Sequence, residues 1–288
     1  MSALAALAAA AAIGAGAGHE MRVASFNVRY GTAPDGEHRW DVRKERVVAA
    51  IERIGADVVG LQEALAFQAS HLRDKLPAFE YFGAGRDDGK EAGEQCGILF
   101  RAARFERTGA GHFWLSETPD VAGSRGFDAA LPRMATWVRL RDREAGGREV
   151  LVVNTHFDHR GARARLESAK LLLERVRALA RDGPAVVTGD FNCGEGSEPY
   201  AALLGAGLLV DAFRERHPER RPDEGTFHDY GGGRDGARID WILHTRHFRA
   251  VEAEIDARPV DGRPPSDHHP VTALLRGWKR APRADRRD

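Results

Sequence analysis

The sequence predicts an α/β fold in which mixed strands are covered by helices. Short apolar runs such as residues 58–61 and 185–188 are typical of buried strands, whereas residues 162–180 carry apolar side chains at helical spacing. Such strands and helices alternate along the chain, a pattern that favours a sheet with helices on its faces over an all-α or all-β protein. With 288 residues and 42% hydrophobic residues, the chain is long enough for one large domain.

The first half of the chain alternates strands and helices. Residues 22–28 are expected to form a strand, followed by a helix that Asp41 caps and Gly55 ends, because apolar residues recur at helical spacing between them. The next expected elements are a strand at 58–61, a helix at 64–76 and a strand at 96–100.

The second half begins with a predicted hairpin. Strands at 137–141 and 150–154 are expected to be joined by the glycine-containing turn at 145–147. The long helix at 162–180 ends before Gly183 and Pro184, which precede the strand at 185–188. Further strands are expected at 238–244, 250–255 and 270–275.

Polar side chains gather where these strands end. Asp190 and Asn192 follow the apolar run at 185–188, and because alternate residues of a strand share a face, we expect both to point the same way. A single such ending has little meaning, but the pattern recurs. Together these endings predict one polar site at the end of a sheet, and the recurring residues are Glu63, His156, Asp240, Asp267 and His268.

Six segments resemble, in the same order, the motifs of the endonuclease/exonuclease/phosphatase superfamily. The resemblance extends over about residues 22–275 and implies a deoxyribonuclease I-like domain at 22–276, a four-layer sandwich of two packed mixed β-sheets flanked by helices. Residues 113–119 and 130–133 further resemble a mainly bacterial branch of poorly defined substrate. The six segments are 25–29, 61–63, 154–156, 189–192, 238–240 and 266–268.

The resemblance implies a divalent-metal-dependent hydrolase of phosphate esters that uses in-line attack by an activated water. A hard cation such as Mg²⁺ or Mn²⁺ offsets the negative charge of the phosphoryl group, and it prefers oxygen ligands. Glu63 is therefore the first choice of metal ligand. By resemblance, Asn27 positions the metal or the phosphate, and Asp267 supplies a second metal contact.

The remaining site residues are expected to handle the phosphoryl group and the water. Asp190 would orient or deprotonate the water, and Asn192 would hold the water or a phosphoryl oxygen. His156 and His268 would donate to phosphoryl oxygens, and Asp240 would keep His268 protonated. The general base stays open between Asp190 and the pair of Asp240 and His268.

The resemblance implies a phosphate-ester substrate, which could be a small molecule, a nucleic acid or a lipid headgroup, and monoester and diester both stay open. Arg133, with Asn192 and His156, is the expected substrate-binding set. Lys+Arg and Asp+Glu both number 43, so no overall positive charge indicates a nucleic-acid partner. The alternative is a catalytically silent phosphate-ester binding module, in which Glu63, Asp190 or His268 should be missing.

The termini carry two further expectations. Residues 1–18 resemble the apolar core of a secretory signal, with a small-x-small site at 15–17 but no basic start. If this is a signal, the protein is secreted or periplasmic, and otherwise it is cytoplasmic. The apolar segment is short for a membrane span of about 20 residues, so we expect no span in the mature chain. We also expect a monomer with a disordered basic tail at 277–288.

Overall fold

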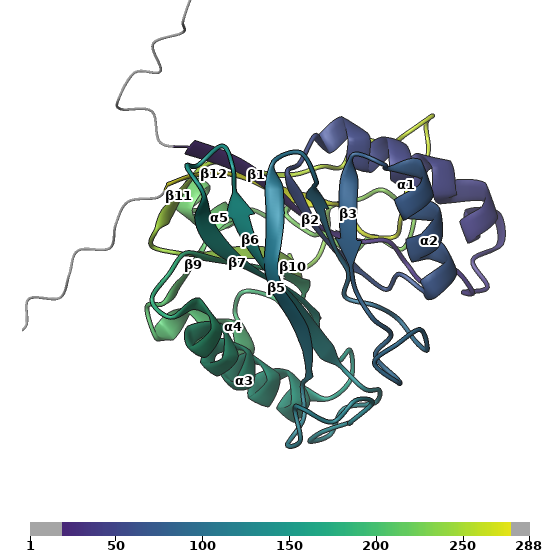
Figure 1. The fold of residues 1–288 in the computed structure, drawn as a ribbon. Coiled ribbons are helices and arrows are strands. Elements are labelled where there is room, and N and C mark those ends of the chain that lie inside the picture. The colour runs from purple at the N-terminus through teal and green to yellow at the C-terminus, as the bar shows by residue number, and fades with distance from the viewer. Residues whose placement is uncertain (1–18, 278–288) are drawn as a thin grey trace, which may run out of the picture.

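The computed structural model describes residues 19–277, and it confirms the expected four-layer sandwich (Figure 1). Two six-stranded sheets pack face to face, and helices cover the outer face of each. The expected signal at 1–18 and residues 278–288 of the expected tail lie outside the described residues. Gly277, assigned to that tail, instead ends the last strand. No helix within 19–277 is long and apolar enough to cross a membrane.

The first sheet has the strand order β11-β12-β1-β2-β4-β3. Helices α1 (Trp40–Ile54) and α2 (Ala66–Lys75) lie on its outer face, preceded by the short helix η1 (Gly36–His38). Its strands are β1 (His19–Asn27), β2 (Val58–Gln62), β3 (Phe79–Phe82), β4 (Ile98–Arg101), β11 (Phe248–Ile255) and β12 (Val271–Gly277).

The second sheet has the order β5-β6-β7-β8-β10-β9. Helices α3 (Ala162–Ala180) and α4 (Glu198–Gly205) cover its outer face, and the short helix α5 (Ala212–Arg216) packs against β11. Its strands are β5 (Phe105–Trp114), β6 (Met134–Asp142), β7 (Arg148–His156), β8 (Ala185–Asp190), β9 (Leu209–Asp211) and β10 (Asp240–Thr245).

Apolar side chains fill the space between all four layers. Between the sheets, Val23 and Phe100 belong to the same cluster as Val150 and Val152, while separate clusters lie under α1 and under α3. Both faces of the central strands are therefore covered, as the five buried residues of β2 show. This is why the central strands appear in the sequence as continuous apolar runs.

Two expectations about local structure were wrong or incomplete. Asp41 does not cap α1, because the helix begins at Trp40 after Arg39 and Asp41 lies in its first turn. Gly55 does end α1, with a left-handed φ of 64°. The edge strands β3 and β5 were missed because they are partly exposed and carry no continuous apolar run.

Strand directions bring five strand ends to one edge of the sandwich. Strands β1 and β2 are parallel, and so are β7 and β8, so the carboxyl ends within each pair coincide. Strand β10 is antiparallel to β8 with Asp240 opposite Asp190, so its first residue lies at the same edge. Residues that end four strands and begin a fifth can therefore share one site.

A buried polar contact joins the two sheets next to this edge. Gln62 Nε2 on β2 donates to Asn154 Oδ1 on β7 at 2.6 Å, and Asn154 Nδ2 donates to the Leu61 carbonyl at 2.7 Å. The sheets approach so closely here that a Cβ on Gly60 would lie 2.1 Å from Thr188 Oγ1. Gly60 is thus required by packing rather than by backbone conformation.

We expect Gly60→Ala to lower the free energy of unfolding by about 1–3 kcal/mol, the usual cost of adding a methyl group to a packed interior. Denaturant unfolding followed by circular dichroism measures this cost. Gly196→Ala is the matched control, because nothing lies within 4 Å of its added Cβ. Equal midpoints for the two variants would contradict the close contact between the sheets.

Candidate active site

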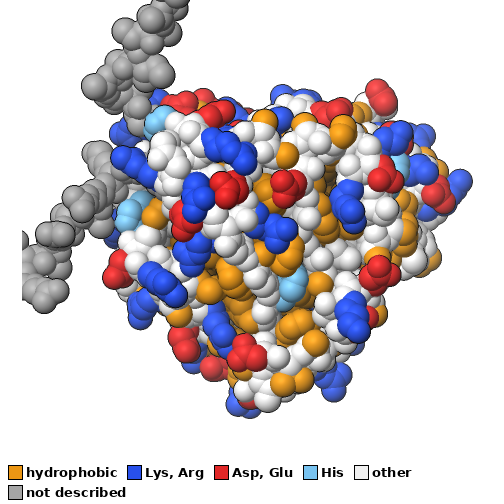
Figure 2. Space-filling view, in the orientation of Figure 1, with side chains coloured by type: hydrophobic (Ala, Val, Ile, Leu, Met, Phe, Trp, Pro, Cys, Tyr) orange, Lys and Arg blue, Asp and Glu red, His pale blue; other side chains and the backbone are white. Residues whose placement is uncertain are grey.

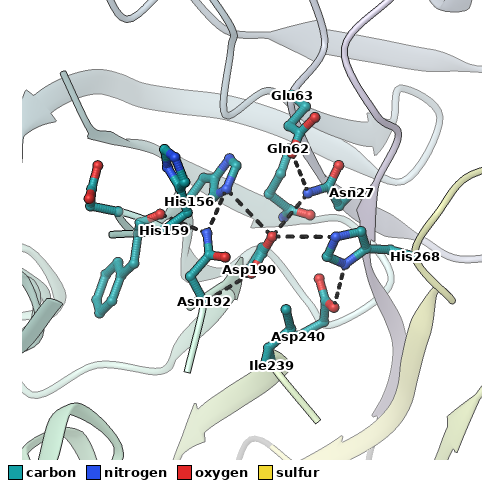
Figure 3. Close-up of polar contacts among 12 residues, drawn as sticks. Asn27, Gln62, Glu63, His156, His159, Asp190, Asn192, Ile239, Asp240 and His268 are labelled. Atoms are coloured by element: carbon teal, nitrogen blue, oxygen red, sulfur yellow. Dashed lines mark hydrogen bonds and ion pairs between the residues drawn. The ribbon is translucent and has the colours of Figure 1, made fainter. Parts of the chain in front are cut away.

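The structure brings the predicted site residues together at the common strand edge (Figure 3). A cavity of about 450 Å³ opens there. Asn27 and Asp240 lie behind its wall and contact residues that line it. The predicted residues that line the cavity are Glu63, Arg133, His156, Asp190, Asn192, Asp267 and His268.

Asp190 lies at the centre of the cluster and is 1% exposed. Its Oδ2 accepts a hydrogen bond from Asn27 Nδ2 at 3.0 Å and lies 3.4 Å from His156 Nε2 and 3.8 Å from His268 Nε2. Burial raises the pKa of Asp190, and the charge of Asp240 raises it further, to about 7. A carboxyl group with such a pKa can accept a proton near neutral pH.

Asp240 and His268 form a buried pair behind Asp190. His268 Nδ1 lies 2.9 Å from Asp240 Oδ2. Burial lowers the pKa of His268, but the carboxylates of Asp240 and Asp190 outweigh this effect and raise it to about 10. His268 is therefore protonated at neutral pH, and its Nε2 side faces Asp190.

His156 is neutral, and its tautomer follows from its neighbours. Asn192 Nδ2 donates to the Phe157 carbonyl at 2.9 Å, which fixes that atom as nitrogen, and the same nitrogen lies 3.0 Å from His156 Nε2. Burial lowers the pKa of His156 well below its usual range, so Nε2 accepts this bond and Nδ1 carries the proton. Nε2 of His156 therefore carries no proton, so this atom cannot make the expected donation to a phosphoryl oxygen.

Asn192 reaches the site by a turn and not by strand alternation. Strand β8 ends at Asp190, and Asn192 has a left-handed φ of 50° with its backbone N–H donating to Asp190 Oδ1 at 2.9 Å. Arg29 and Glu63, which also follow strands into the site, have φ values of 55° and 66°. Left-handed backbone is unfavourable for such residues, and it concentrates at functional sites.

The predicted metal residues are adjacent but do not all present oxygen. Asn27 Nδ2 donates to Glu63 Oε1 at 3.0 Å, while Asn27 Oδ1 accepts from the Arg29 backbone N–H at 2.9 Å. Asn27 therefore orients Glu63 and Asp190 and does not turn its oxygen toward the cavity. Asp267 lines the same cavity. Its Oδ2 lies 3.6 Å from Arg29 Nη1.

The carboxylates in the cavity fit a hard divalent cation. Burial raises the pKa of Asp267, and the negative charge of Glu63 raises it further, so the two acids repel each other through the cavity. Glu63, Glu94 and His156 also have ligand atoms that all lie within 4.8 Å of one another. Several carboxylate oxygens around one space suit Mg²⁺ or Mn²⁺.

Glu94 is a site residue that the sequence analysis missed. Its carboxylate accepts two hydrogen bonds from Arg86, at 2.6 and 2.8 Å, and Oε2 lies 3.7 Å from His156 Nδ1. Glu94 lies outside the six family-like segments and four residues before β4 begins at Ile98. Since β4 runs antiparallel to β2, its beginning lies at the same edge. The sequence did offer one signal for Glu94, because this acid precedes the apolar run at residues 98–100.

Arg133 lines the cavity but does not project freely into it. It is 4% exposed, with Nε 3.4 Å from Asp158 Oδ2 and Nη2 3.0 Å from His159 Nδ1. Its Nη1 is buried and has no hydrogen-bond partner among residues 19–277. A buried guanidinium nitrogen without a partner is costly, so the packing around Arg133 is not fully satisfied by hydrogen bonds.

Sequence comparison decides the family once this geometry is known. The model of the Endonuclease/Exonuclease/phosphatase family matches residues 24–268. The chain belongs to this family. Family proteins of Bacteroides thetaiotaomicron and Bacteroides vulgatus share 34% and 37% sequence identity with it, with TM-scores of 0.84 and 0.83. Each comparison covers 90% of this chain. It covers 98% of the Bacteroides thetaiotaomicron structure and 99% of the Bacteroides vulgatus structure.

A third family structure has a named activity. It is the mannosyl-6-phosphatase of Bacteroides thetaiotaomicron, with 34% identity, a TM-score of 0.82, and coverage of 88% of this chain and 99% of the other. The curated relatives that the chain matches are longer proteins, of which it spans 22% to 49%. Membership in the family supports hydrolysis of phosphate esters.

Proposed function

We propose that the protein is a divalent-metal-dependent phosphoric ester hydrolase that activates a water for in-line attack on phosphorus. The observation that carries this proposal is the setting of Asp190. One buried acid with a pKa of about 7 lies between a neutral histidine and a protonated histidine, at the wall of a cavity lined by further carboxylates. This arrangement combines a proton acceptor with a positive charge.

Glu63 and Asp267 would hold the cation, and Asn27 would keep Glu63 in place. A bound Mg²⁺ or Mn²⁺ supplies charge that polarises the phosphoryl group and stabilises its developing negative charge. The Tyr30 backbone N–H donates to Glu63 Oε2 at 3.0 Å, so both oxygens of Glu63 are oriented by hydrogen bonds. Such supporting contacts tune how well a carboxylate binds a metal.

The protonation states favour Asp190 as the general base. The pair of Asp240 and His268 cannot accept a proton at neutral pH, because His268 already carries one. Asp190 can accept the proton of the attacking water, and His268 Nε2–H can donate to a phosphoryl oxygen. Asn27 and Asn192 would then hold the Asp190 carboxylate in place, through Asn27 Nδ2 at 3.0 Å and the backbone N–H of Asn192 at 2.9 Å.

A phosphate monoester is the favoured substrate. One neighbour with a named activity and more than 25% identity is a mannosyl-6-phosphatase, which supports a phosphorylated sugar. The human Nocturnin catalytic domain is 18% identical, a likeness that extends to the fold alone. On the face shown in Figure 2, positive and negative side chains are interspersed and form no continuous basic tract for a nucleic acid.

The alternative of a silent binding module predicts a site that lacks a catalytic group. Glu63, Asp190 and His268 are all present, and all three line one cavity. Nothing in this arrangement favours binding without turnover, so hydrolysis is the better account of the site.

Chelation with EDTA is expected to abolish hydrolysis of p-nitrophenyl phosphate, and added Mg²⁺ or Mn²⁺ should restore it. Glu63→Gln is expected to weaken Mn²⁺ binding by at least about 10-fold, since even outer groups around a metal change its affinity by about 10–100-fold. Isothermal titration with Mn²⁺ measures the binding directly.

Glu52→Gln, on the exposed side of α1, is the matched control and should titrate like the parent. Full activity in EDTA-treated, metal-free protein would overturn metal dependence. An unchanged titration in Glu63→Gln would place the metal on other residues.

A further inference from the structure

Two exposed apolar side chains lie at the mouth of the polar cavity. Within residues 19–277, five large hydrophobic side chains are exposed, and two of them, Leu131 at 38% and Phe227 at 46%, line this cavity. Exposed apolar groups beside a pocket with a few polar groups are typical of a small-molecule site. Hydrolysis of the phosphate itself does not require either side chain.

Phe227 is fixed relative to the catalytic pair. Its residue forms an antiparallel bridge with His268, and the His228 N–H donates to the Asp267 carbonyl at 2.9 Å. The neighbouring Thr226 Oγ1 accepts from the Asp240 backbone N–H at 3.2 Å. The Phe227 ring lies 5.1 Å from the His268 ring, centroid to centroid. These contacts fix the backbone of Phe227 and keep its ring beside His268 at the mouth of the cavity.

The opposite wall of the cavity supplies polar contacts. His159 and His268 lie on opposite sides of Asp190 (Figure 3), and Arg133 contacts His159. Arg133 and His268 both line the cavity, so a phosphate over Asp190 has a nitrogen-bearing side chain on each side.

The cavity is large enough for more than a phosphate group. Its volume of about 450 Å³ falls within the range of about 300–1,000 Å³ for small-molecule sites. A charged floor and an apolar rim suit a ligand with an anionic end and a ring that has an apolar face. A sugar ring presents C–H groups on its faces and hydroxyl groups at its edge. Sites for nucleic-acid bases instead combine stacking aromatics with a basic groove. This cavity combines Phe227 and Tyr30 with aliphatic Leu131 and with several acids, among them Glu63 and Asp267.

We propose that Phe227 and Leu131 bind the ring of a phosphorylated sugar, while Arg133 and His268 hold its phosphate. This inference rests on the proposed phosphomonoester hydrolysis and adds the residues that select the leaving group. Phe227 and Leu131 are thus specificity-determining residues. They act on substrate choice and leave the attack of water to Asp190.

Two substrates with the same kind of leaving group test the proposal. Mannose 6-phosphate and glycerol 3-phosphate both release a primary alcohol, so their ratio of kcat/KM reports on recognition of the ring. Phe227→Ala is expected to lower this ratio by about 10-fold, the scale of one lost aromatic contact, mainly through KM for the sugar. Phe227→Tyr should keep the ratio because it keeps the ring.

Phe67→Ala is the matched control, since Phe67 is exposed to 47% and does not line the cavity. An unchanged ratio in Phe227→Ala, with both esters hydrolysed, would overturn the proposal and leave the hydrolase assignment standing. Faster hydrolysis of adenosine monophosphate than of mannose 6-phosphate would replace the sugar by a nucleoside.

Binding measurements can test the ring site even if the proposed hydrolysis is wrong. If no ester is turned over with added metal, titration still compares the affinities of mannose 6-phosphate and glycerol 3-phosphate. Tighter binding of the sugar that is lost in Phe227→Ala would support the ring site even though hydrolysis had failed. Equal affinities in the parent protein would overturn it.

Discussion

Asp190→Asn is expected to lower kcat by at least about 10²-fold, with a much smaller change in KM. The substitution keeps the shape of the side chain but removes its capacity to accept the proton of water. Steady-state hydrolysis of p-nitrophenyl phosphate at saturating Mg²⁺ or Mn²⁺ measures the loss. Asp120→Asn, an exposed acid that pairs with Arg175 on α3, is the control and should retain the parental kcat.

Stability distinguishes a catalytic from a structural role for Asp190. Its pKa in the folded protein, about 7, lies above the usual value of about 3.9. As the pH rises through this window, the unfolded chain releases the proton before the folded protein does, so ionisation of Asp190 opposes folding. Asp190→Asn should therefore be no less stable than the parent at pH 8. A large loss of stability with normal kcat would contradict the catalytic assignment.

His268→Ala is expected to lower kcat by roughly 10²–10³-fold, the scale of losing one donor to a developing negative charge. The double variant with Asp190→Asn should lose less than the product of the two single effects, because both residues act on one transition state. Rapid-quench or steady-state measurement of kcat in all three variants provides the test. Parental turnover in both folded single variants would show that the chemistry lies elsewhere.

Asp240→Asn tests whether the positive charge of His268 is needed, because the substitution removes the neighbouring carboxylate but keeps a side chain of the same shape beside the ring. The Asp240 carboxylate is the main group that raises the pKa of His268, so its loss should lower that pKa from about 10. Because the proposed reaction needs protonated His268, the alkaline limb of the kcat profile should move to lower pH. An unchanged limb would mean that His268 is not the group whose deprotonation ends activity.

The sequence was sufficient for the architecture of the central sheets. Strands β2, β7 and β8 are buried on both faces along their apolar runs, which are therefore continuous in the sequence. The expectation that several strands end in one site also followed from the residues, because Glu63, His156 and Asp190 each stand where such a run ends. The partly exposed edge strands β3 and β5 carry no such signal.

The identity of the candidate site residues followed from the sequence, but their states depend on contacts between distant segments. Asn27 turns its amide nitrogen to Glu63 and Asp190, which lie 36 and 163 positions away. His156 is neutral and His268 is protonated, although both are buried, because only His268 contacts Asp240. Spacing along the chain does not encode such differences.

The sequence by itself determined the family, the packed sheets and the set of strand-end acids, since these depend on local apolar periodicity and on motifs of a few residues. The tertiary structure alone decided that Glu94 joins the site, that Arg133 is buried against Asp158 and His159, and that Phe227 lies against His268. Each of these facts depends on which strand runs antiparallel to which and on which loop closes over the edge. Burial and electrostatics act through space, so chain order does not reveal them.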